Sequence, residues 1–311
     1  MTYNIQAHRG APTKIRFLNE SKGTQEMSEQ MNCLEVWGGN QGVEQHFHMP
    51  GLDVWLHSCP IDNAANGGDV YYLSSCASGR ISRLLVADVS GHGSTVSKLA
   101  LRLRDLMRRH INRISQARFV GGMNEEFAGF NQEGRFATAF VGTFFASTGS
   151  LQICTAGHPQ PLIYRHSSNT WDVLDKNRDS AMASNLPLGI MEGVEYGQSR
   201  LKIEPGDMIL VYTDGVTEAR VANGQMLTTR GLLKLVQSLN ISDPSRLLPS
   251  LLASLRHHST APVGDDVTVL LARADGSGVS LRNNLLSPFR LLLSARDATR
   301  FRESVVSDSP D

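Results

Sequence analysis

The sequence lacks an excess of charge of either sign. Its 311 residues contain 30 Lys and Arg against 30 Asp and Glu, so the formal net charge is zero. Proteins that attract nucleic acid or anionic membranes usually present a clear basic surface. The charge balance therefore gives no indication of a nucleic-acid or membrane partner, and it argues against a nuclease.

Long apolar runs and paired cysteines are also missing. No apolar stretch approaches the roughly 20 residues that span a bilayer, and residues 1–11 lack the charged-then-apolar order of a signal peptide. The four cysteines, Cys33, Cys59, Cys76 and Cys154, form no CxxC pair. This scatter argues against a zinc site or disulfide framework built from them, and we expect a cytoplasmic protein with reduced thiols.

The most informative stretch is VADVSGHG at 86–93. An apolar run over 81–87 ends on Asp88, a glycine-rich turn follows, and apolar residues then recur with helical period over 94–114. Ser94 is predicted to cap this helix. The pattern predicts a buried strand that presents a carboxylate at the rim of a sheet, directly before a long helix.

A tight hairpin is predicted just before this carboxylate. Residues 70–75 and 81–87 have strand patterns, and Ser78-Gly79 suits a two-residue turn between them. With that turn, Asp69 pairs with Asp88 and Tyr72 pairs with Leu85. Directly opposed Cβ atoms are about 5 Å apart. Two carboxylates that close repel each other unless a proton or a metal ion lies between them.

Two further acids lie at comparable strand edges. Asp214 follows an apolar run that begins at residue 208, and Asp265 precedes another over 267–272. Antiparallel neighbours place the end of one strand beside the start of the next, so all four acids can gather at one end of a sheet assembly. Each Asp-Gly sequence alone is typical of an ordinary turn. Four together favour a site for Mg²⁺ or Mn²⁺, where two ions can activate a hydroxide and hold phosphate oxygens.

Histidines and arginines offer weaker signals. His46 and His48 share one face of a predicted strand with metal-compatible spacing, but such isolated pairs more often have a structural or surface role. The helix predicted over 94–114 carries five arginines opposite its apolar face: Arg102, Arg104, Arg108, Arg109 and Arg113. A solvated basic face is the simpler interpretation, and a docking surface for an acidic partner is the alternative.

The remaining pattern predicts one main domain. Residues 1–30 are expected to be a flexible extension, residues 31–274 the domain, and residues 275–311 a tail that is partly helical or disordered. Further strands are expected over 33–37, 52–56, 136–147, 151–155, 161–165, 199–203, 208–213 and 267–272, and further helices over 119–130, 231–239 and 244–257. Residues 171–185 are expected to form a polar loop.

Six motifs in order resemble the PPM-type metal-dependent phosphatases (protein phosphatase 2C), in the bacterial branch of sporulation stage II E and stress-response sigma-factor regulators. They are NGGD at 66–69, VADVSGHG at 86–93, TAGHP at 155–159, LPLG at 186–189, YTDGVTE at 212–218 and GDDVTVL at 264–270. The resemblance covers residues 50–272. It implies an α+β fold, a four-layer α-β-β-α sandwich of two mainly antiparallel sheets flanked by helices.

The same resemblance implies an activity and a site. The activity is hydrolysis of phosphoserine or phosphothreonine on a signalling protein, such as an anti-sigma-factor antagonist, by a hydroxide activated by two Mn²⁺ or Mg²⁺ ions. Asp69, Asp88, the Val89 carbonyl, Asp214 and Asp265 would hold the ions, with Asp266 behind them. His92 is a candidate proton donor, and His158 is expected to be structural.

Two departures from the family pattern are visible. Tyr72 stands where the branch usually has a second acid, and no phosphate-binding arginine can be placed, since Arg80 would lie at the far end of the hairpin. Regulation is expected from an activating partner or from the terminal segments, and the helix over 94–114 is the element expected to transmit a partner's signal to Asp88. The alternative function is a catalytically weak binding module that regulates a partner.

Overall fold

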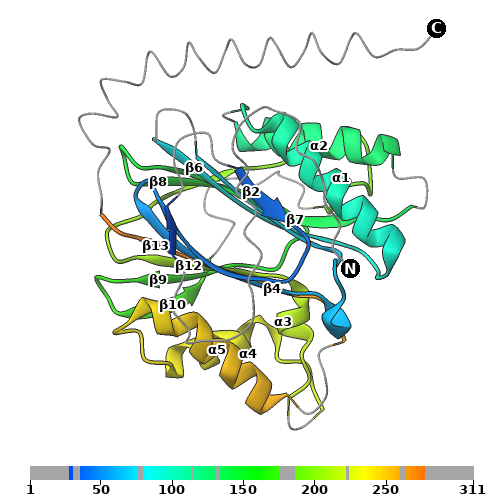
Figure 1. Cartoon of the computed structure of the whole chain (residues 1–311). Coiled ribbons are helices and arrows are strands. Elements are labelled where there is room, and N and C mark those ends of the chain that lie inside the picture. Colours follow the sequence, from blue (N-terminus) through cyan, green and yellow to red (C-terminus); the bar gives the residue numbers. More distant parts are fainter. Residues whose placement is uncertain are drawn as a thin grey trace, which may run out of the picture.

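The fold is a sandwich of two β-sheets between two helical layers (Figure 1). A computed structural model describes residues 28–30, 36–75, 80–113, 115–130, 134–174, 186–221, 224–259 and 264–276. Helices α1 (Ser94–His110) and α2 (Gln116–Phe130) cover one sheet, whereas α4 (Thr228–Ser238) and α5 (Pro244–His258) cover the other. The four-layer α+β sandwich expected from the sequence is confirmed.

The sheet beneath α1 and α2 has six strands in the order β11-β8-β7-β6-β5-β2. All its pairs are antiparallel. Its strands are β2 (Val36–Gly39), β5 (Asp69–Ser75), β6 (Ile81–Val89), β7 (Ala137–Phe145), β8 (Ser150–Ala156) and β11 (Ser199–Lys202). The predicted register is confirmed, since Asp69 pairs with Asp88 and Tyr72 with Leu85. The turn at 76–79 lies outside the described residues.

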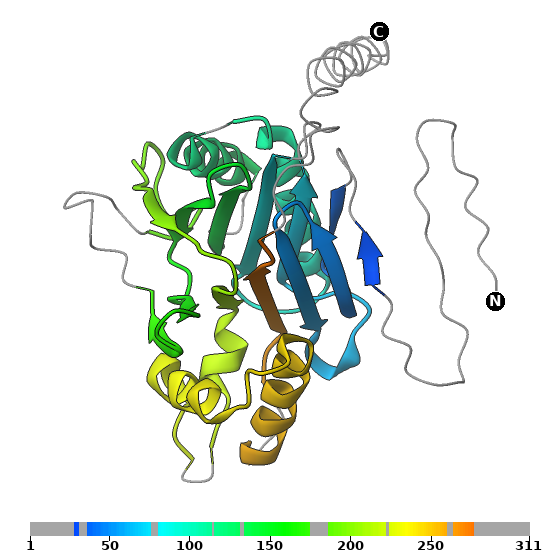
Figure 2. The same ribbon diagram turned by 90° about the vertical axis from the view of Figure 1, so that its left-hand side faces the viewer.

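The other sheet has seven strands in the order β1-β3-β4-β13-β12-β9-β10. Its members are β1 (Ser28–Gln30), β3 (Val43–Met49), β4 (Leu52–Cys59), β9 (Leu162–Arg165), β10 (Thr170–Val173), β12 (Met208–Tyr212) and β13 (Val267–Ala274). Strand β1 pairs with β3 in parallel, and the other pairs are antiparallel. Figure 2 shows β1 at the edge of this sheet, beyond β3.

Alternating side chains along the strands build three apolar layers. On β5, Tyr71 and Leu73 point between the sheets, whereas Val70 and Tyr72 point toward α1 and α2. The same alternation sends Val211 of β12 between the sheets and Tyr212 toward α4 and α5. Because successive strand residues face opposite sides, each sheet is buried on both faces in its centre.

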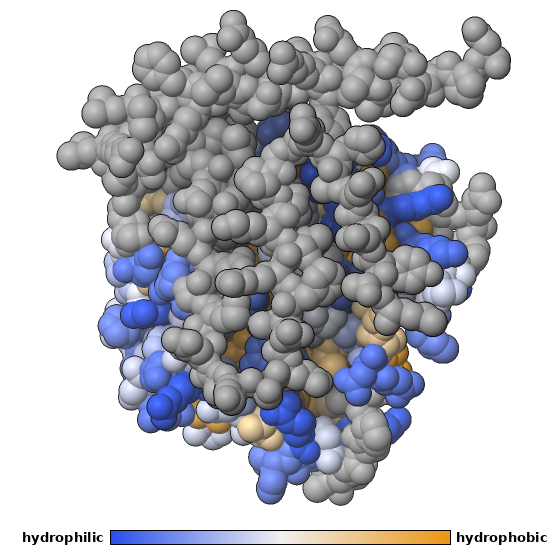
Figure 3. Space-filling view, in the orientation of Figure 1, coloured by the Kyte–Doolittle hydropathy of each residue, from blue (hydrophilic) through white to orange (hydrophobic). Residues whose placement is uncertain are grey.

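Two short helices lie at the ends of strands in the seven-stranded sheet. The 3₁₀ turn η1 (Ile61–Asn63) follows β4, and α3 (Asp214–Glu218) follows β12. On the face shown in Figure 3, most of the described surface is hydrophilic, with small apolar patches between polar side chains. Within the described residues, no helix combines the length and apolar character that a membrane crossing requires.

Several predicted elements differ from the structure in their ends. The helix predicted over 94–114 ends at His110, and its N-cap is Gly93 rather than Ser94, which is already helical. Strand β2 continues through Gly38 and Gly39, beyond the predicted end at residue 37; residues 31–35 lie outside the described residues. Strand β1 lies within the predicted extension 1–30. Strand β10 interrupts the predicted loop 171–185, because Trp171 is buried against Tyr164.

Candidate metal centre

Two carboxylates of the candidate site lie side by side on the six-stranded sheet. Asp69 begins β5, and its partner Asp88 lies one residue from the end of β6. Both belong to the strand face that also carries Tyr71 and Val86, so they point into the space between the sheets at one end of the sandwich. Asp69 is only 3% exposed, so water screens its charge very little.

The seven-stranded sheet supplies two more carboxylates at the same end. Asp214 begins α3 immediately after β12, and Asp265 lies two residues before β13. Strands β12 and β13 are antiparallel neighbours, so the end of the first lies beside the start of the second. The electrostatic interaction of Asp88 with both Asp214 and Asp265 shows that the two sheets bring their acids together.

A threonine joins the two sheets at this point. The Thr213 hydroxyl donates a hydrogen bond of 2.8 Å to Asp69 Oδ2, and its oxygen accepts one of 2.9 Å from the backbone N–H of Thr268. Thr213 is fully buried. The bond fixes the orientation of the Asp69 carboxylate and crosses from β12 to β5, so the acids depend on the packing of one sheet against the other.

The electrostatics of the cluster are unfavourable for a protein without bound cations. Burial and the neighbouring Asp88 raise the pKa of Asp69 well above its usual range. Burial, followed by the charges of Asp214 and Asp265, raises the pKa of Asp88 to about 8. Burial is also the main reason that the pKa values of Asp214 and Asp265 are raised. Only a bound proton or cation relieves such crowding of negative charge.

Asp266 has a different role from the other acids. Its Oδ1 accepts a hydrogen bond of 2.7 Å from the Ile61 backbone N–H, and its Oδ2 accepts bonds from the N–H groups of Gly68 (2.5 Å) and Asp69 (3.3 Å). A Cβ at Gly67 would lie 2.5 Å from Oδ2, so only glycine fits there. Asp266 therefore positions the loop that carries Asp69.

The turn after Asp88 is shaped by glycine. Gly91 and Gly93 have φ angles of 95° and 97°, a region that favours glycine, and they flank His92. The Arg135 guanidinium donates a bond of 3.1 Å to the Ser90 carbonyl and supports this turn. His92 is exposed and makes a small contribution that opposes the burial-driven rise in the pKa of Asp265, so the candidate proton donor lies near the acids. The Val89 carbonyl lies beside Gly68, at 3.0 Å from the position of a Cβ there.

The donor set fits hard divalent ions. The four predicted aspartate ligands offer carboxylate oxygens, and their raised pKa values indicate that added positive charge would be favourable. Among the described residues, no three of these acids bring one oxygen each within 4.8 Å of one another. Mg²⁺ and Mn²⁺ usually keep several waters, so widely spaced carboxylates can still hold them.

Some residues at the site were not predicted. Thr213, Arg135 and Glu218 of α3 were missed, although Glu218 adds its negative charge to Asp88 and Asp214. Glu218 is part of the YTDGVTE motif, and that was the available signal. His158 is buried and bonded to the Thr138 hydroxyl at 3.0 Å, as expected of a structural residue. Tyr72 faces α1 and α2, on the opposite side of β5 from Asp69.

A cleft of about 640 Å³ opens beside the acids. It lies between η1, α3 and α5, and its lining includes His57, Ile61, Val216, Leu255, Arg256 and Asp265. Its wall is more apolar than polar, and Asp265 links it to the carboxylate cluster. Its size and composition are typical of a ligand-binding cleft.

The sandwich with its carboxylates at one end defines the class of protein: the fold is that of the PP2C, or PPM-type, phosphatase domain. The phosphatase domain of SpoIIE from Bacillus subtilis superimposes with a TM-score of 0.59 at 16% identity, over 78% of this chain and 64% of that one. The structure of the RsbU and RsbW domains of Rv1364c from Mycobacterium tuberculosis gives a TM-score of 0.63 at 26% identity, over 77% and 63% of the two chains.

Sequence comparison identifies the family. The profile of stage II sporulation protein E (SpoIIE) matches residues 78–275, and the chain belongs to this family. It is 30% identical over 138 residues to the phosphoserine phosphatase RsbU of Bacillus subtilis, covering 44% of this chain and 39% of RsbU. It is 24% identical over 278 residues to protein IcfG of Synechocystis, covering 79% and 42%. The match thus spans about two-fifths of the length of these relatives.

Proposed function

We propose that this protein is a metal-dependent serine/threonine protein phosphatase that acts on a phosphorylated bacterial signalling protein. The observation that carries the proposal is the convergence of Asp69, Asp88, Asp214 and Asp265 from two sheets, with pKa values raised by burial and mutual repulsion. Membership in the SpoIIE family and similarity to a phosphoserine phosphatase support the same reaction.

In this proposal the four acids and the Val89 carbonyl hold two ions, Mn²⁺ or Mg²⁺. Such ions lower the pKa of a water and neutralise the phosphate oxygens. The Thr213 hydroxyl and the Asp266 carboxylate keep the Asp69 segment in place. His92, exposed at the turn beside Asp265, would give a proton to the leaving seryl oxygen.

The cleft next to Asp265 would hold the peptide that flanks the phosphorylated residue. Its apolar wall, with Ile61, Val216 and Leu255, suits side chains of an extended segment, and Arg256 suits an acidic or phosphorylated neighbour. An anti-sigma-factor antagonist is the substrate we propose. We take residues 31–274 as the catalytic domain, working in the cytoplasm, and we propose that a protein partner controls it.

The test is phosphate release from a phosphoserine peptide, with Mn²⁺, with Mg²⁺ or with chelator. We expect turnover that needs a divalent ion, that Asp214→Asn abolishes, and that Asp105→Asn leaves unchanged. Asp105 is a suitable control because it is an exposed aspartate paired with Arg104 on α1. Absence of turnover at every metal concentration, also after addition of cell extract, would contradict the proposal and favour the binding module.

A further inference from the structure

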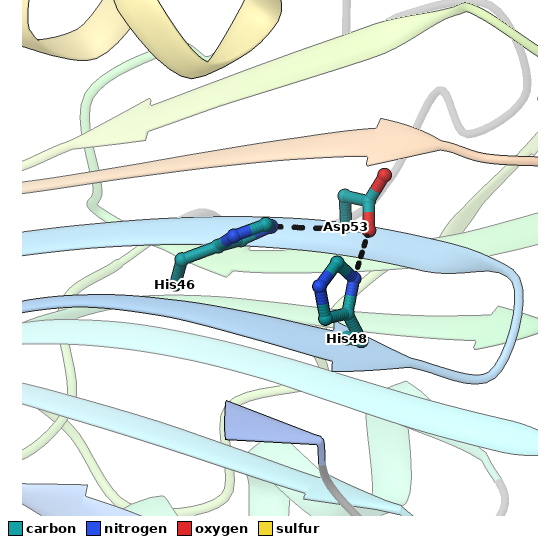
Figure 4. Close-up of side chains that lie close together, drawn as sticks. All are labelled: His46, His48 and Asp53. Carbon is teal, nitrogen blue, oxygen red and sulfur yellow. Dashed lines mark hydrogen bonds and ion pairs between the residues drawn. The ribbon is translucent and has the colours of Figure 1, made fainter. Parts of the chain in front are cut away.

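A second group of possible metal ligands lies away from the acidic cluster. His46 and His48 are two residues apart on β3, so they share the face of the seven-stranded sheet that carries Trp55. Pairing with β4 places Asp53 opposite His48 and Trp55 opposite His46. Figure 4 shows both imidazoles directed toward the Asp53 carboxylate.

We propose that His46, His48 and Asp53 form a separate binding site for a transition-metal ion such as Zn²⁺, at the far end of the seven-stranded sheet from the acids. One nitrogen or oxygen from each residue lies within 4.8 Å of the others. No other set of three His, Cys, Asp or Glu side chains among the described residues has ligand atoms this close together.

The distances fit one ion with little movement. His48 Nδ1 lies 2.6 Å from Asp53 Oδ1, and His46 Nε2 lies 3.8 Å from the same oxygen. Two ligand atoms about 2.0–2.1 Å from a tetrahedral Zn²⁺ are roughly 3.3 Å apart. The two observed distances lie on either side of that value, so small rotations of His48 and Asp53 would accommodate the ion.

The orientation of His46 supports a metal site over a simple hydrogen-bonded pair of His48 and Asp53. Its ring stacks on Trp55, with the centroids 4.5 Å apart and the planes 6° from parallel, and its side chain is 13% exposed. Its Nε2 is buried and makes no hydrogen bond within the described structure, although it lies on the Asp53 side. A buried imidazole nitrogen held in one direction without a hydrogen bond is costly unless a ligand satisfies it.

The chemistry of this group differs from that of the acidic cluster. Two imidazoles and one carboxylate suit Zn²⁺, Ni²⁺ or Co²⁺, whereas carboxylates alone suit Mg²⁺ and Mn²⁺. Three protein ligands leave a position for water, which can enter because the His48 side chain is 47% exposed. Arg273 lies 4.0 Å from Asp53 Oδ2 and leaves Oδ1 to the imidazoles.

The two groups are well separated along the sheet. Arg273, which pairs with Asp53, is eight residues from Asp265, a distance of roughly 26 Å along a strand. An ion at His46, His48 and Asp53 would fasten β3 to β4 at their hairpin and would not take part in phosphate chemistry. Its effect is therefore expected on the stability of this edge of the sheet.

The test is a Zn²⁺ titration of the untagged full chain in saturating Mg²⁺, which occupies oxygen-rich sites and competes poorly for imidazole. Bound zinc is measured by equilibrium dialysis. We expect the wild type to bind one Zn²⁺ per chain at this group, with affinity lowered about tenfold or more by His48→Gln and by Asp53→Asn. His166→Gln is the matched control, because His166 is an exposed histidine in the turn that directly follows β9 of the same sheet, and this variant should bind zinc like the wild type.

Co²⁺ gives a second readout that does not depend on the variants folding. A tetrahedral site with nitrogen ligands should give intense visible absorption in the wild type, which added Zn²⁺ removes. Equal zinc affinity in the wild type and in folded His48→Gln and Asp53→Asn would overturn the proposal. So would a wild type that binds no Zn²⁺ and gives no tetrahedral Co²⁺ spectrum.

Discussion

The acidic cluster and the His46–His48–Asp53 group lie at opposite ends of the seven-stranded sheet. The carboxyl pKa values at these two ends are shifted in opposite directions. At the acidic end, burial and like charges raise the pKa of Asp88 to about 8. At the other end, the neighbouring His46 and His48 lower the pKa of Asp53 despite its partial burial. At the acidic end, the repulsion between the carboxylates favours the binding of an external cation. At the other end, the two imidazoles interact favourably with the carboxylate of Asp53.

The acidic end therefore needs bound cations for stability, whereas the His46–His48–Asp53 group can bind an ion but is stable without one. Buried carboxylates that repel each other reduce the stability of the folded chain until protons or ions neutralise them. A carboxylate that already accepts a hydrogen bond from an imidazole gains less from an ion. Removing metal should therefore affect the acidic end much more, and the following predictions test this contrast in order of decreasing effect.

The largest effect is expected for Asp88→Asn. Loss of this ligand should lower Mn²⁺-dependent turnover by more than about 100-fold, since even groups behind metal ligands commonly cost 10- to 100-fold. In chelator the same variant should melt at a higher temperature than the wild type, because the folded chain no longer has to protonate this carboxyl or bury its charge. A variant that loses activity and also melts lower without metal would contradict the charge argument.

Asp266→Asn should have the next largest effect. The amide nitrogen that replaces one oxygen cannot accept the bonds from Gly68 and Asp69 or the bond from Ile61. We expect a loss of about 1–3 kcal/mol of unfolding free energy and a 10- to 100-fold weaker activation by Mn²⁺. High Mn²⁺ should restore most of the turnover, and failure to do so would place Asp266 among the direct ligands.

The third prediction concerns pH. Between the unfolded value of 3.8 and about 8, Asp88 binds more protons in the folded than in the unfolded chain. The free energy of unfolding of the metal-free protein should therefore decrease as pH rises through this window. Melting curves in chelator from pH 5 to 8 would measure it, with Asp88→Asn as the reference that removes the slope of this group. An equal slope in both proteins would be the contrary result.

Thr213→Val should have a moderate effect. The variant keeps the shape of the side chain but loses the hydroxyl that donates to Asp69 Oδ2. Loss of about 1 kcal/mol corresponds to roughly fivefold weaker metal binding, measured as a higher Mn²⁺ concentration for half-maximal turnover. Thr213→Ser retains the donor and should behave like the wild type. Equal behaviour of the Val and Ser variants would show that the hydroxyl does not matter.

The smallest effect is expected for Tyr72→Phe. Tyr72 points toward α1 and α2, and its buried hydroxyl has no hydrogen-bond partner within the described residues. Removing that hydroxyl should change the unfolding free energy by less than about 0.5 kcal/mol in the destabilising direction and leave Mn²⁺ activation unchanged. A changed metal requirement would mean that this face of β5 communicates with the acids.

Local patterns predicted much of the acidic site. The Ser78-Gly79 sequence predicted the pairing of Asp69 with Asp88, which the strand register confirms. Thr213 and Arg135 were missed because their roles depend on how distant segments pack, which no local pattern encodes. Glu218 was missed although its signal was local, since it closes the YTDGVTE motif and a single turn of α3 brings its charge back toward Asp214.

The other end of the sheet shows the same limit. The spacing of His46 and His48 was visible in the sequence, but Asp53 joins them only through the register of β3 on β4. The burial of Trp171 likewise depends on Tyr164 and the helix above it, so β10 was taken for a loop. The Ser94 cap failed because Gly93, with its φ of 97°, ends the turn one residue earlier.

The hydrogen bond from Thr213 to Asp69 has a consequence for the order of folding. It connects residues 144 positions apart, and each sheet alone carries only two of the four principal acids. The binding site is therefore complete only after the two sheets have docked, which is a late event for contacts so distant in sequence. Divalent ions should accordingly slow unfolding while leaving the folding rate almost unchanged. Bound metal would then increase the kinetic stability of the folded protein.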